Sequence, residues 1–317
     1  MVDYLRLSLT DRCNLNCVYC TPREKAAYLQ HEDLLRHEEL ARAAAAFVRA
    51  GVTKVRLTGG EPLLRKNITG LVKLLKAIPG LKELALTTNG VLLAPLAADL
   101  RSAGLDRVNI SLDSLNPKVF KEITGSGSLE EAWDGLMAAL RSGFTEVKLN
   151  VVLLKGLNEA EAPEFARLSM DFPLTVRFIE FYSTNERAGR LGDALVTTAE
   201  TKRRIEAAYG PLQLQPPARS DGPAQVYRRP GAKGKIGFIS GRSDYFCANC
   251  NRVRMDCAGK VYPCLFSPAT HDIRSLLRGG ATDEALAEYV GRIFLVKSNY
   301  KKDSSTAGHI EMSSLGG

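Results

Sequence analysis

Three cysteines near the start of the chain have a spacing that suits metal chemistry. Cys13, Cys17 and Cys20 follow the pattern C-x3-C-x2-C. An iron–sulfur cluster of the cubane type takes four thiolates, so a loop that offers three leaves one iron free to bind a small molecule. The alternative is a structural zinc loop completed by His31 or His37, although zinc sites usually pair their ligands two and two. The spacing therefore favours an iron–sulfur cluster with one open iron.

A second group of three cysteines lies near the other end of the chain. Cys247, Cys250 and Cys264 follow the pattern C-x2-C-x13-C, which again leaves one iron open. Alone, this group would also suit a zinc ribbon that lacks one ligand. Because the chain also contains the first cysteine group, a second iron–sulfur cluster is the better interpretation. Cys257 lies between these residues and is interpreted as a spare thiol.

Length, charge and cysteine content limit the classes of protein to which the chain can belong. The chain has 317 residues, enough for one large α/β domain with an appended portion or for two domains. Its net charge of +8 suggests an anionic partner, either nucleic acid or a small polyphosphate. Clumped cysteines suit metal ligation in a reducing compartment. No signal peptide and no apolar run long enough for a bilayer is found, so we expect a cytoplasmic protein.

Short strand-like and helix-like segments alternate from Tyr4 to about Phe181, which predicts a parallel sheet with helical crossovers. Six units are too few for the closed eight-fold barrel, so we expect an α/β fold built on an open six-unit barrel over residues 1–182. The predicted strands are Tyr4–Leu9, Lys54–Thr58, Glu83–Thr88, Arg107–Leu112, Glu146–Leu153 and Thr175–Phe181. The predicted helices include Glu38–Ala50, Leu64–Ala77, Leu129–Ser142 and Glu159–Asp171.

The pattern changes after Phe181 and becomes richer in polar residues, Pro and Gly. We expect residues 183–317 to form a C-terminal α+β portion that carries the second cysteine group. It contains a predicted helix at Thr198–Tyr209 and predicted strands at Gln225–Arg229 and Lys235–Ser240.

Polar and apolar residues alternate along the predicted barrel strands. A parallel sheet covered by helices on both faces would instead be almost continuously apolar. If the apolar residues face the outer helices, the polar ones point into one lumen. Four strands then each contribute a cation to it, namely Arg6, Arg56, Lys148 and Arg177. A solvated sheet face would also alternate but would not explain why these charges are nearly all positive, so we expect an anion pocket. A zinc-containing nucleic-acid-binding module would instead carry basic and aromatic residues together on an exposed stretch, and no such stretch is present in the sequence.

Three loops follow predicted strands at the end of the barrel where sites are usually built. They are Gly59-Gly60-Glu61-Pro62, Thr87-Thr88-Asn89-Gly90 and Ser111-Leu112-Asp113. The glycine pair permits close approach of the backbone to a ligand. Ordinary turns and a helix cap would also explain these loops.

The first cysteine group is the signature of the radical S-adenosylmethionine (SAM) superfamily, and the whole chain resembles the GTP 3′,8-cyclase family of molybdenum cofactor biosynthesis. The narrower resemblance is carried by the second cysteine group, the run from Cys247 to Arg254 and the terminal Gly316-Gly317. Further matching segments are 5–8, 10–13, 55–62, 87–90, 177–181 and 221–224. A radical SAM enzyme acting on an RNA base or a peptide would not explain the lumen cations together with the second cysteine group.

The resemblance implies an enzyme with two [4Fe–4S] clusters and SAM. The first cluster would chelate SAM and, when reduced, release a 5′-deoxyadenosyl radical that takes hydrogen from C3′ of GTP. The C3′ radical would attack C8, and reduction and protonation of the resulting radical would give (8S)-3′,8-cyclo-7,8-dihydroguanosine 5′-triphosphate. The open iron of the second cluster would bind the guanine.

The resemblance also implies roles for individual residues. The positions that contact SAM match Tyr19, Gly60, Ser111 and Tyr182, the last of which stands where the family often has methionine. The GTP-binding positions match Arg6, Arg56, Thr87, Lys148, Arg177, Arg252 and Arg254. Arg252 and Arg254, with Gly316 and Gly317, would act in catalysis. The implied partners are a flavodoxin-like or ferredoxin-like reductant, a cyclic pyranopterin monophosphate synthase that receives the product, and a second copy in a homodimer, with no nucleic acid and no membrane.

Overall fold

The computed structural model describes residues 2–20, 28–181, 186–218, 222–241, 243, 250–265 and 271–297. Its centre is a row of six parallel strands joined by helical crossovers. The strands are β1 (Tyr4–Ser8), β2 (Lys54–Thr58), β3 (Glu83–Thr88), β4 (Arg107–Ser111), β5 (Glu146–Val152) and β6 (Thr175–Ile179). Each was predicted from the sequence to within two residues at its C-terminal end.

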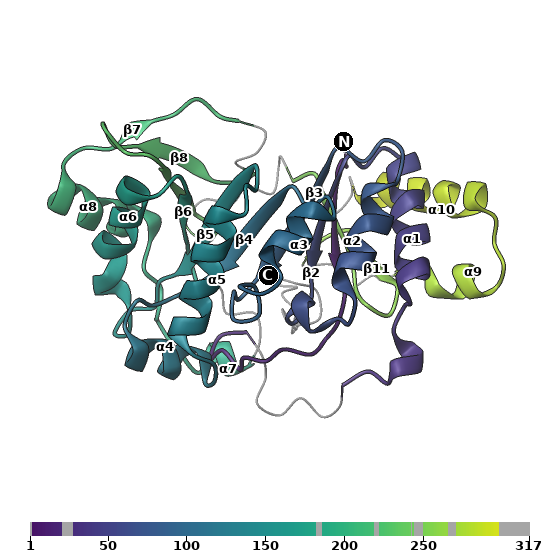
Figure 1. Ribbon diagram of the computed structural model, residues 1–317, viewed down its shortest axis with the longest axis horizontal. Helices are drawn as coiled ribbons and strands as arrows, with labels where there is room; N and C mark the ends of the chain where they lie inside the picture. Colours follow the sequence, from purple (N-terminus) through teal and green to yellow (C-terminus); the bar gives the residue numbers. More distant parts are fainter. Residues whose placement is uncertain are drawn as a thin grey trace.

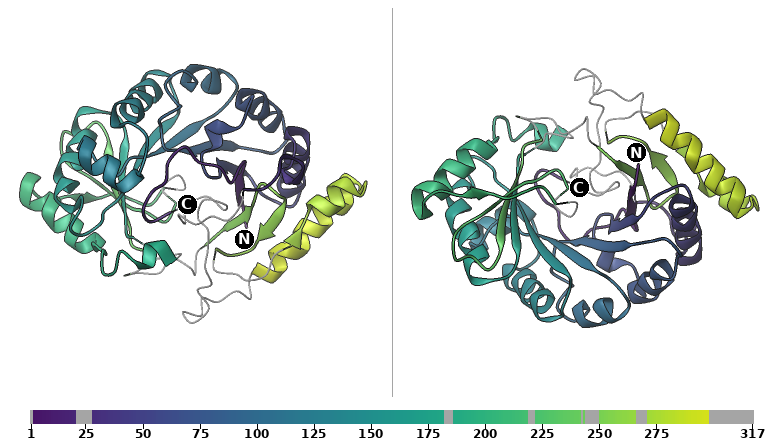
Figure 2. Two further views of the ribbon diagram at one scale, coloured as in Figure 1. Left: turned by 90° about the horizontal axis from the view of Figure 1, so that it is seen from below. Right: turned by 90° about the horizontal axis from the view of Figure 1, so that it is seen from above.

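The helices of this half lie outside the strands. They are α1 (His37–Arg49), α2 (Ile68–Lys76), α3 (Ala97–Ser102), α4 (Pro117–Thr124), α5 (Leu129–Arg141) and α6 (Ala162–Asp171), with 3₁₀ turns at His31–Asp33, Pro62–Leu64 and Glu159–Glu161. Seen along the strands, the sheet curves into an incomplete ring with the helices around it (Figure 2). The predicted open six-unit barrel is confirmed.

The C-terminal half adds short strands and helices. They are α7 (Glu186–Gly189), α8 (Thr198–Tyr209), β7 (Gln213–Leu214), β8 (Gln225–Arg228), β9 (Lys235–Ile239), β10 (Arg252–Met255), β11 (Lys260–Tyr262), β12 (His271–Asp272), α9 (Arg274–Arg278) and α10 (Asp283–Lys297). The predicted helix at Thr198–Tyr209 and the strands β8 and β9 are confirmed, whereas β10, β11 and β12 were not predicted.

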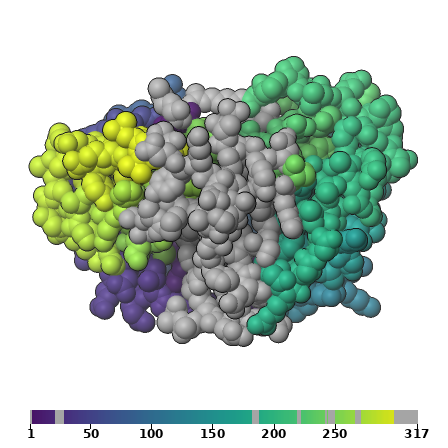
Figure 3. Space-filling model, turned by 180° about the vertical axis from the view of Figure 1, so that it is seen from behind, coloured from purple at the N-terminus to yellow at the C-terminus, as the bar shows by residue number. Residues whose placement is uncertain are grey.

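These C-terminal strands extend both edges of the barrel sheet. The twelve strands lie in the order β12-β11-β10-β1-β2-β3-β4-β5-β6-β9-β8-β7. β10 runs parallel to β1 and β9 runs parallel to β6, so the outermost pairs extend opposite edges of the sheet (Figure 1). Figure 3 shows the green and the yellow parts of the C-terminal half on opposite sides of the molecule. The C-terminal half is therefore hydrogen-bonded to the barrel at both edges. A division of the chain at residue 182 stays a prediction.

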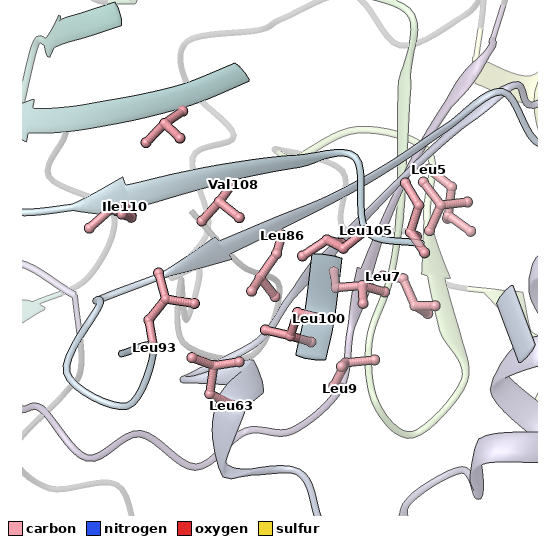
Figure 4. Packing of buried hydrophobic residues seen from close by; sticks show 14 of the residues in the cluster. Leu5, Leu7, Leu9, Leu63, Leu86, Leu93, Leu100, Leu105, Val108 and Ile110 are labelled. Carbon is pink, nitrogen blue, oxygen red and sulfur yellow. The ribbon is translucent and has the colours of Figure 1, made fainter. Parts of the chain in front are cut away.

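The apolar residues of the strands face outward, toward the helices. Leu5, Leu7 and Leu9 are fully buried, and Figure 4 shows them beside Leu86 and Leu100 in one cluster. Each such side chain contributes roughly 1.5–3 kcal/mol of stability through burial. Because successive strand residues point to opposite faces, this packing directs the polar residues between them to the inner face.

One predicted helix begins later than expected. α2 starts at Ile68 and not at Leu64. The Glu61 carboxylate accepts the Leu63 N–H at 3.0 Å and closes a 3₁₀ turn there, and Asn67 adopts a left-handed backbone with φ of 52°. Both features interrupt the helical hydrogen bonds before Ile68. Of the helices within the described ranges, none combines the length and the apolar character that a bilayer span requires.

Candidate functional site

Buried cations line the inner face of the barrel. Arg6, Arg56, Lys148, Arg177 and Arg254 retain only 3–8% of their exposure. Arg6 lies directly between Arg254 on β10 and Arg56 on β2 in the strand register. The structure thus brings together the four predicted lumen cations and adds Arg254 from the C-terminal half.

The cations influence one another across the lumen. Burial, Arg177 and Arg56 together lower the pKa of Lys148 to about 8, although Glu146, whose carboxylate lies 3.1 Å from the Lys148 Nζ, opposes this shift. Burial also lowers the pKa of Arg177, again with a contribution from Arg56. Buried like charges are costly unless a counter-charge compensates them. The arrangement therefore favours a bound anion.

Hydrogen bonds hold some of these side chains in place. Arg177 donates from Nε and from a terminal nitrogen to the Asn150 Oδ1, at 2.9 and 2.5 Å. Arg56 donates to the Leu86 carbonyl and the Thr87 hydroxyl, each at 3.4 Å. Thr87 therefore adjoins Arg56, as two residues of one binding site should.

The first cysteine loop follows the C-terminal end of β1 and packs on the glycine turn after β2. Gly60 donates its N–H to the Thr10 carbonyl at 2.8 Å. A side chain on Gly60 would begin only 2.1 Å from the Arg12 carbonyl oxygen. Glycine is thus required here because the cysteine loop lies directly against it. A contact between Gly60 and SAM stays a prediction.

Glu61 joins the neighbouring loops beneath the cysteines. Its buried carboxylate accepts the Asn89 N–H and the Thr88 hydroxyl, both at 2.8 Å. Asn89 in turn donates to the Asn14 Oδ1 at 2.8 Å and lies 3.9 Å from the Cys13 Sγ. The loops after β2 and β3 therefore fix the position of the cysteine loop.

Tyr19 connects the cysteine loop to the far side of the barrel. Its hydroxyl donates to Asp113, just beyond β4, and Asp113 also accepts the Val152 N–H at 2.8 Å. Burial raises the pKa of Asp113 to about 6. Ser111 ends β4 two residues before Asp113. The structure thus brings Tyr19 and the end of β4 together, as expected for residues of one ligand site.

The first loop offers three thiols, the kind of donor that an iron–sulfur cluster takes. Burial raises the pKa of Cys13 to about 12, and the charges of Glu61 and Cys20 add to the shift. Metal binding would release that thiol proton. Within the described ranges, no three His, Cys, Asp or Glu side chains are grouped so as to hold a single metal ion.

The second cysteine group lies in cationic surroundings. Burial would raise the pKa of Cys250, but the charges of Arg252, Lys297 and Arg254 and a backbone hydrogen bond lower it. The Lys297 Nζ lies 3.8 Å from the Cys250 Sγ and donates to the Pro263 carbonyl, next to Cys264, at 2.9 Å. Nearby cations favour the thiolate form, which binds metals. Cys250 and Cys264 therefore fit a metal site.

Several predicted site residues lie outside the described ranges: Tyr182, Cys247, Gly316 and Gly317. Cys257 is buried in the turn after β10, whereas Cys250 precedes that strand. The strand separates them by roughly 13 Å or more, at about 3.3 Å per residue. Cys257 is thus remote from Cys250, in keeping with its interpretation as a spare thiol.

The structure adds one residue that the sequence analysis missed. Tyr4 lies two residues before Arg6 on the same face of β1, and its hydroxyl accepts a hydrogen bond from the Arg56 Nε at 2.5 Å. The alternation that identified Arg6 could have identified Tyr4 as well. It was overlooked because only the charged residues of the lumen were counted.

The two cysteine sites lie at opposite ends of the lumen. β1 and β10 are parallel and adjacent. Cys13 follows the C-terminal end of β1, whereas Cys250 precedes the N-terminal end of β10. The rows that contain Arg254, Arg6 and Arg56 lie between these ends.

Comparison with known proteins agrees with this arrangement. Residues 7–169 match the Radical SAM superfamily, and residues 174–302 match the family described as Molybdenum Cofactor Synthesis C. The GTP 3′,8-cyclase of Moorella thermoacetica is 44% identical over all of this chain and 98% of its own length. The chain belongs to the GTP 3′,8-cyclase family. The relative of the same name in Gloeobacter violaceus is 45% identical over 100% of this chain and 99% of its own length. The one in Geobacter sulfurreducens is also 45% identical, over 92% of this chain and 89% of its own length.

Solved structures share the fold of this cyclase family member at low sequence identity. Streptococcus suis SuiB, bound to the precursor peptide SuiA, has a TM-score of 0.61 at 14% identity and covers 98% of this chain and 70% of its own. HydG, a maturase of the [FeFe]-hydrogenase, has a TM-score of 0.53 at 14% identity over 66% of this chain and 50% of its own. These likenesses concern the fold alone.

Proposed function

We propose that this chain converts GTP to (8S)-3′,8-cyclo-7,8-dihydroguanosine 5′-triphosphate, the first step of molybdenum cofactor biosynthesis. The observation that carries the proposal is the set of buried cations between two cysteine sites at opposite ends of one lumen. A polyphosphate placed there would have one end near each site. Membership of the cyclase family supports GTP as that polyphosphate.

The cysteines would hold the groups that the family requires. Cys13, Cys17 and Cys20 would bind one [4Fe–4S] cluster, and Cys247, Cys250 and Cys264 would bind the other. When bound, the clusters and SAM would supply the radical that removes the C3′ hydrogen, and one further electron and a proton would complete the product once C3′ has joined C8. Tyr19, Gly60, Ser111 and Tyr182 are the residues proposed to contact SAM.

The lumen residues would bind and orient the triphosphate. Arginines can donate two parallel hydrogen bonds to a phosphate and fix its direction. Their burial keeps bulk water away, which strengthens each charge–charge contact. Near the second cysteine site, Arg252 and Arg254 would orient the guanine end during catalysis with the Gly316-Gly317 terminus. The proposed GTP contacts are Arg6, Arg56, Thr87, Lys148, Arg177, Arg252 and Arg254.

The chemistry also implies partners and a compartment. We infer a flavodoxin-like or ferredoxin-like reductant, because the first cluster needs an electron for each SAM cleaved. The product would pass to a cyclic pyranopterin monophosphate synthase, and the chain would act as a homodimer in the cytoplasm. No nucleic acid is required.

The test uses anaerobically reconstituted protein, reduced with dithionite and incubated with SAM and GTP. We expect mass spectrometry to detect 5′-deoxyadenosine together with an isomer of GTP of unchanged mass. If 5′-deoxyadenosine formed while GTP stayed unaltered, the radical chemistry would stand and the substrate would be wrong. Protein with both clusters verified that cleaved no SAM would overturn the whole proposal.

A further inference from the structure

Tyr4 has a side chain that is ordinarily neutral, but it lies among cations. In the strand register it lies between Lys54 on β2 and Arg252 on β10. Its hydroxyl accepts a hydrogen bond from the Arg56 Nε at 2.5 Å. The Lys54 Nζ and the Arg56 guanidinium carbon lie 5.0 and 5.9 Å from the centre of its ring, close enough for cation–π attraction.

The surrounding charges favour the phenolate of Tyr4. Burial would raise its pKa, but four cations outweigh burial and lower the pKa from 10.0 to about 7. The four are Arg56, Arg6, Lys54 and Arg252, from β2, β1 and β10. Arg177 on β6 and Arg254 on β10 are also close enough for Tyr4 to act on their pKa values. All six of these groups are positive, and the carboxylates beside them are Glu83, which pairs with Lys54 at 2.6 Å, and Glu146, which raises the pKa of Arg177.

We propose that Tyr4 is a positioning residue for the substrate triphosphate. Its hydroxyl holds Arg56 in place, and its phenolate supplies a negative charge to the lumen cations until the triphosphate takes over that role. This inference rests on the proposed function of the same site. The hydrogen bonds from Arg56 to Tyr4, Leu86 and Thr87 fix its guanidinium from two sides. The geometry suits an arginine that is held ready for a bidentate contact with phosphate.

The proposal has a consequence for protons. When the triphosphate enters, its negative charge makes the phenolate of Tyr4 unfavourable. The phenolate oxygen then takes up one proton from solvent, and Arg56 keeps its hydrogen bond to the neutral hydroxyl. GTP binding is therefore coupled to proton uptake at Tyr4, and the affinity for GTP falls as the pH rises above about 7.

The test compares the wild type with Tyr4→Phe, using the protein with both clusters loaded under anaerobic conditions. The dissociation constant for GTP is measured by isothermal titration calorimetry from about pH 6.5 to about pH 8.5, in buffers of different ionisation enthalpy. The buffers report the protons taken up on binding. Protonation of GTP itself affects both proteins alike, so the difference between them isolates Tyr4.

A matched control is Tyr227→Phe. Tyr227 also has a cation beside its ring, with the Lys202 Nζ 5.2 Å from its centre, but it packs against Phe238 on the outer side of the sheet. Thermal unfolding of all three proteins checks that they are folded. We expect Tyr227→Phe to behave like the wild type in affinity and in proton uptake.

We expect Tyr4→Phe to bind GTP several-fold more weakly than the wild type at about pH 6.5 and to take up fewer protons on binding. Between pH 6.5 and 8.5 the wild-type dissociation constant rises by about tenfold more than that of the variant. Equal affinity and equal proton uptake in folded Tyr4→Phe would overturn the inference. A loss of affinity without any change in proton uptake would leave Tyr4 a purely structural support for Arg56 and would equally overturn it. If neither protein bound GTP, the proposed function itself would be wrong.

Discussion

The two ends of the lumen differ in the charge around their cysteines. At the first site, burial raises the pKa of Cys13 to about 12, and the charge of Glu61 adds to the shift. At the second site, Arg252, Arg254 and Lys297 lower the pKa of Cys250 in spite of burial. One end therefore combines thiols with buried carboxyl groups, and the other combines thiols with cations.

This difference matches the charges of the two ligands of the cyclase family. SAM carries a positively charged sulfonium and amino group, which suits the end that contains Glu61 and Asp113. GTP carries a triphosphate, which suits the cations of the middle and of the second end. Electrostatic complementarity of this kind contributes more to specificity than to affinity. We infer that the lumen sorts its two ligands by charge.

The largest expected effect separates the two cysteine sites. Cys17→Ala should abolish SAM cleavage, because it removes a ligand of the first cluster. Removing a residue that only hydrogen-bonds to a metal ligand already lowers activity roughly 10–100-fold, and removing the ligand itself should cost more. Cys250→Ala should retain SAM cleavage and lose the cyclic product. The measurement is 5′-deoxyadenosine and cyclised nucleotide per chain, by mass spectrometry.

Cys257→Ala is the control for both cysteine variants. Because Cys257 is a buried thiol that is remote from Cys250 and is not part of either predicted ligand group, both products should form at near wild-type rates, with about 1 kcal/mol lost in the free energy of unfolding. Loss of cyclisation in Cys257→Ala would mean that this thiol is a ligand after all.

The next effect concerns the cationic layer. Arg254→Ala should weaken GTP binding by about 2–4 kcal/mol, because it removes a buried charge that pairs with phosphate or base. SAM cleavage should change little. Arg254→Lys should restore only part of the affinity, since lysine cannot make the bidentate contact.

Arg292→Ala is the matched control for the arginine variants. Arg292 is exposed on α10, where it pairs with Glu288 at 3.5 Å and lies 5.9 Å from the centre of the Tyr289 ring. GTP affinity should be unchanged, as measured by calorimetry. If both alanine variants weakened binding equally, net charge and not position would explain the effect.

A smaller effect follows from the pKa of Lys148. That pKa is lowered to about 8, so Lys148 is charged below pH 8 and loses its proton as the pH rises through that value. A bound triphosphate would favour the charged form, and GTP affinity should therefore fall by up to about fivefold between pH 8 and pH 9. Lys148→Arg should flatten this part of the profile. A profile that kept its slope in Lys148→Arg would assign the titration to another group.

The smallest effect tests the surroundings of the second site alone. Lys297→Met removes the cation 3.8 Å from the Cys250 Sγ but keeps much of the side-chain volume. We expect a few-fold slower cyclisation, since one nearby charge contributes roughly 1 kcal/mol at a partly buried position. SAM cleavage in the absence of GTP should be unaffected. An equal fall in both activities would show that the two ends are not independent.

Local patterns in the sequence predicted the barrel well. Strands such as Lys54–Thr58 and Glu83–Thr88 have the predicted bounds, because alternation of polar and apolar residues follows directly from the strand period. The same alternation placed Arg6, Arg56, Lys148 and Arg177 on one face. The first cysteine loop was also predictable, because all three residues lie within one short segment.

Pairings between distant segments were not predictable in the same way. Arg252-Val253-Arg254-Met255 alternates like the barrel strands, yet it was interpreted as a binding motif and not as a strand. Nothing in those four residues indicates that they pair with β1. The pairing depends on the register of Arg6 with Arg254, which only the folded chain reveals.

The pairing of β1 with β10 also has a consequence for synthesis of the protein. Asn251 donates from its side chain to Asp3 across 248 residues of sequence, at the start of this strand pair. While the chain is being made, the free edge of β1 remains without its neighbour until the last quarter has emerged from the ribosome. Unpaired strand edges are prone to aggregation, and contacts of such long range form slowly. The strand that begins the barrel is thus among the last to be completed, and newly made chains depend on protection of that edge until β10 arrives.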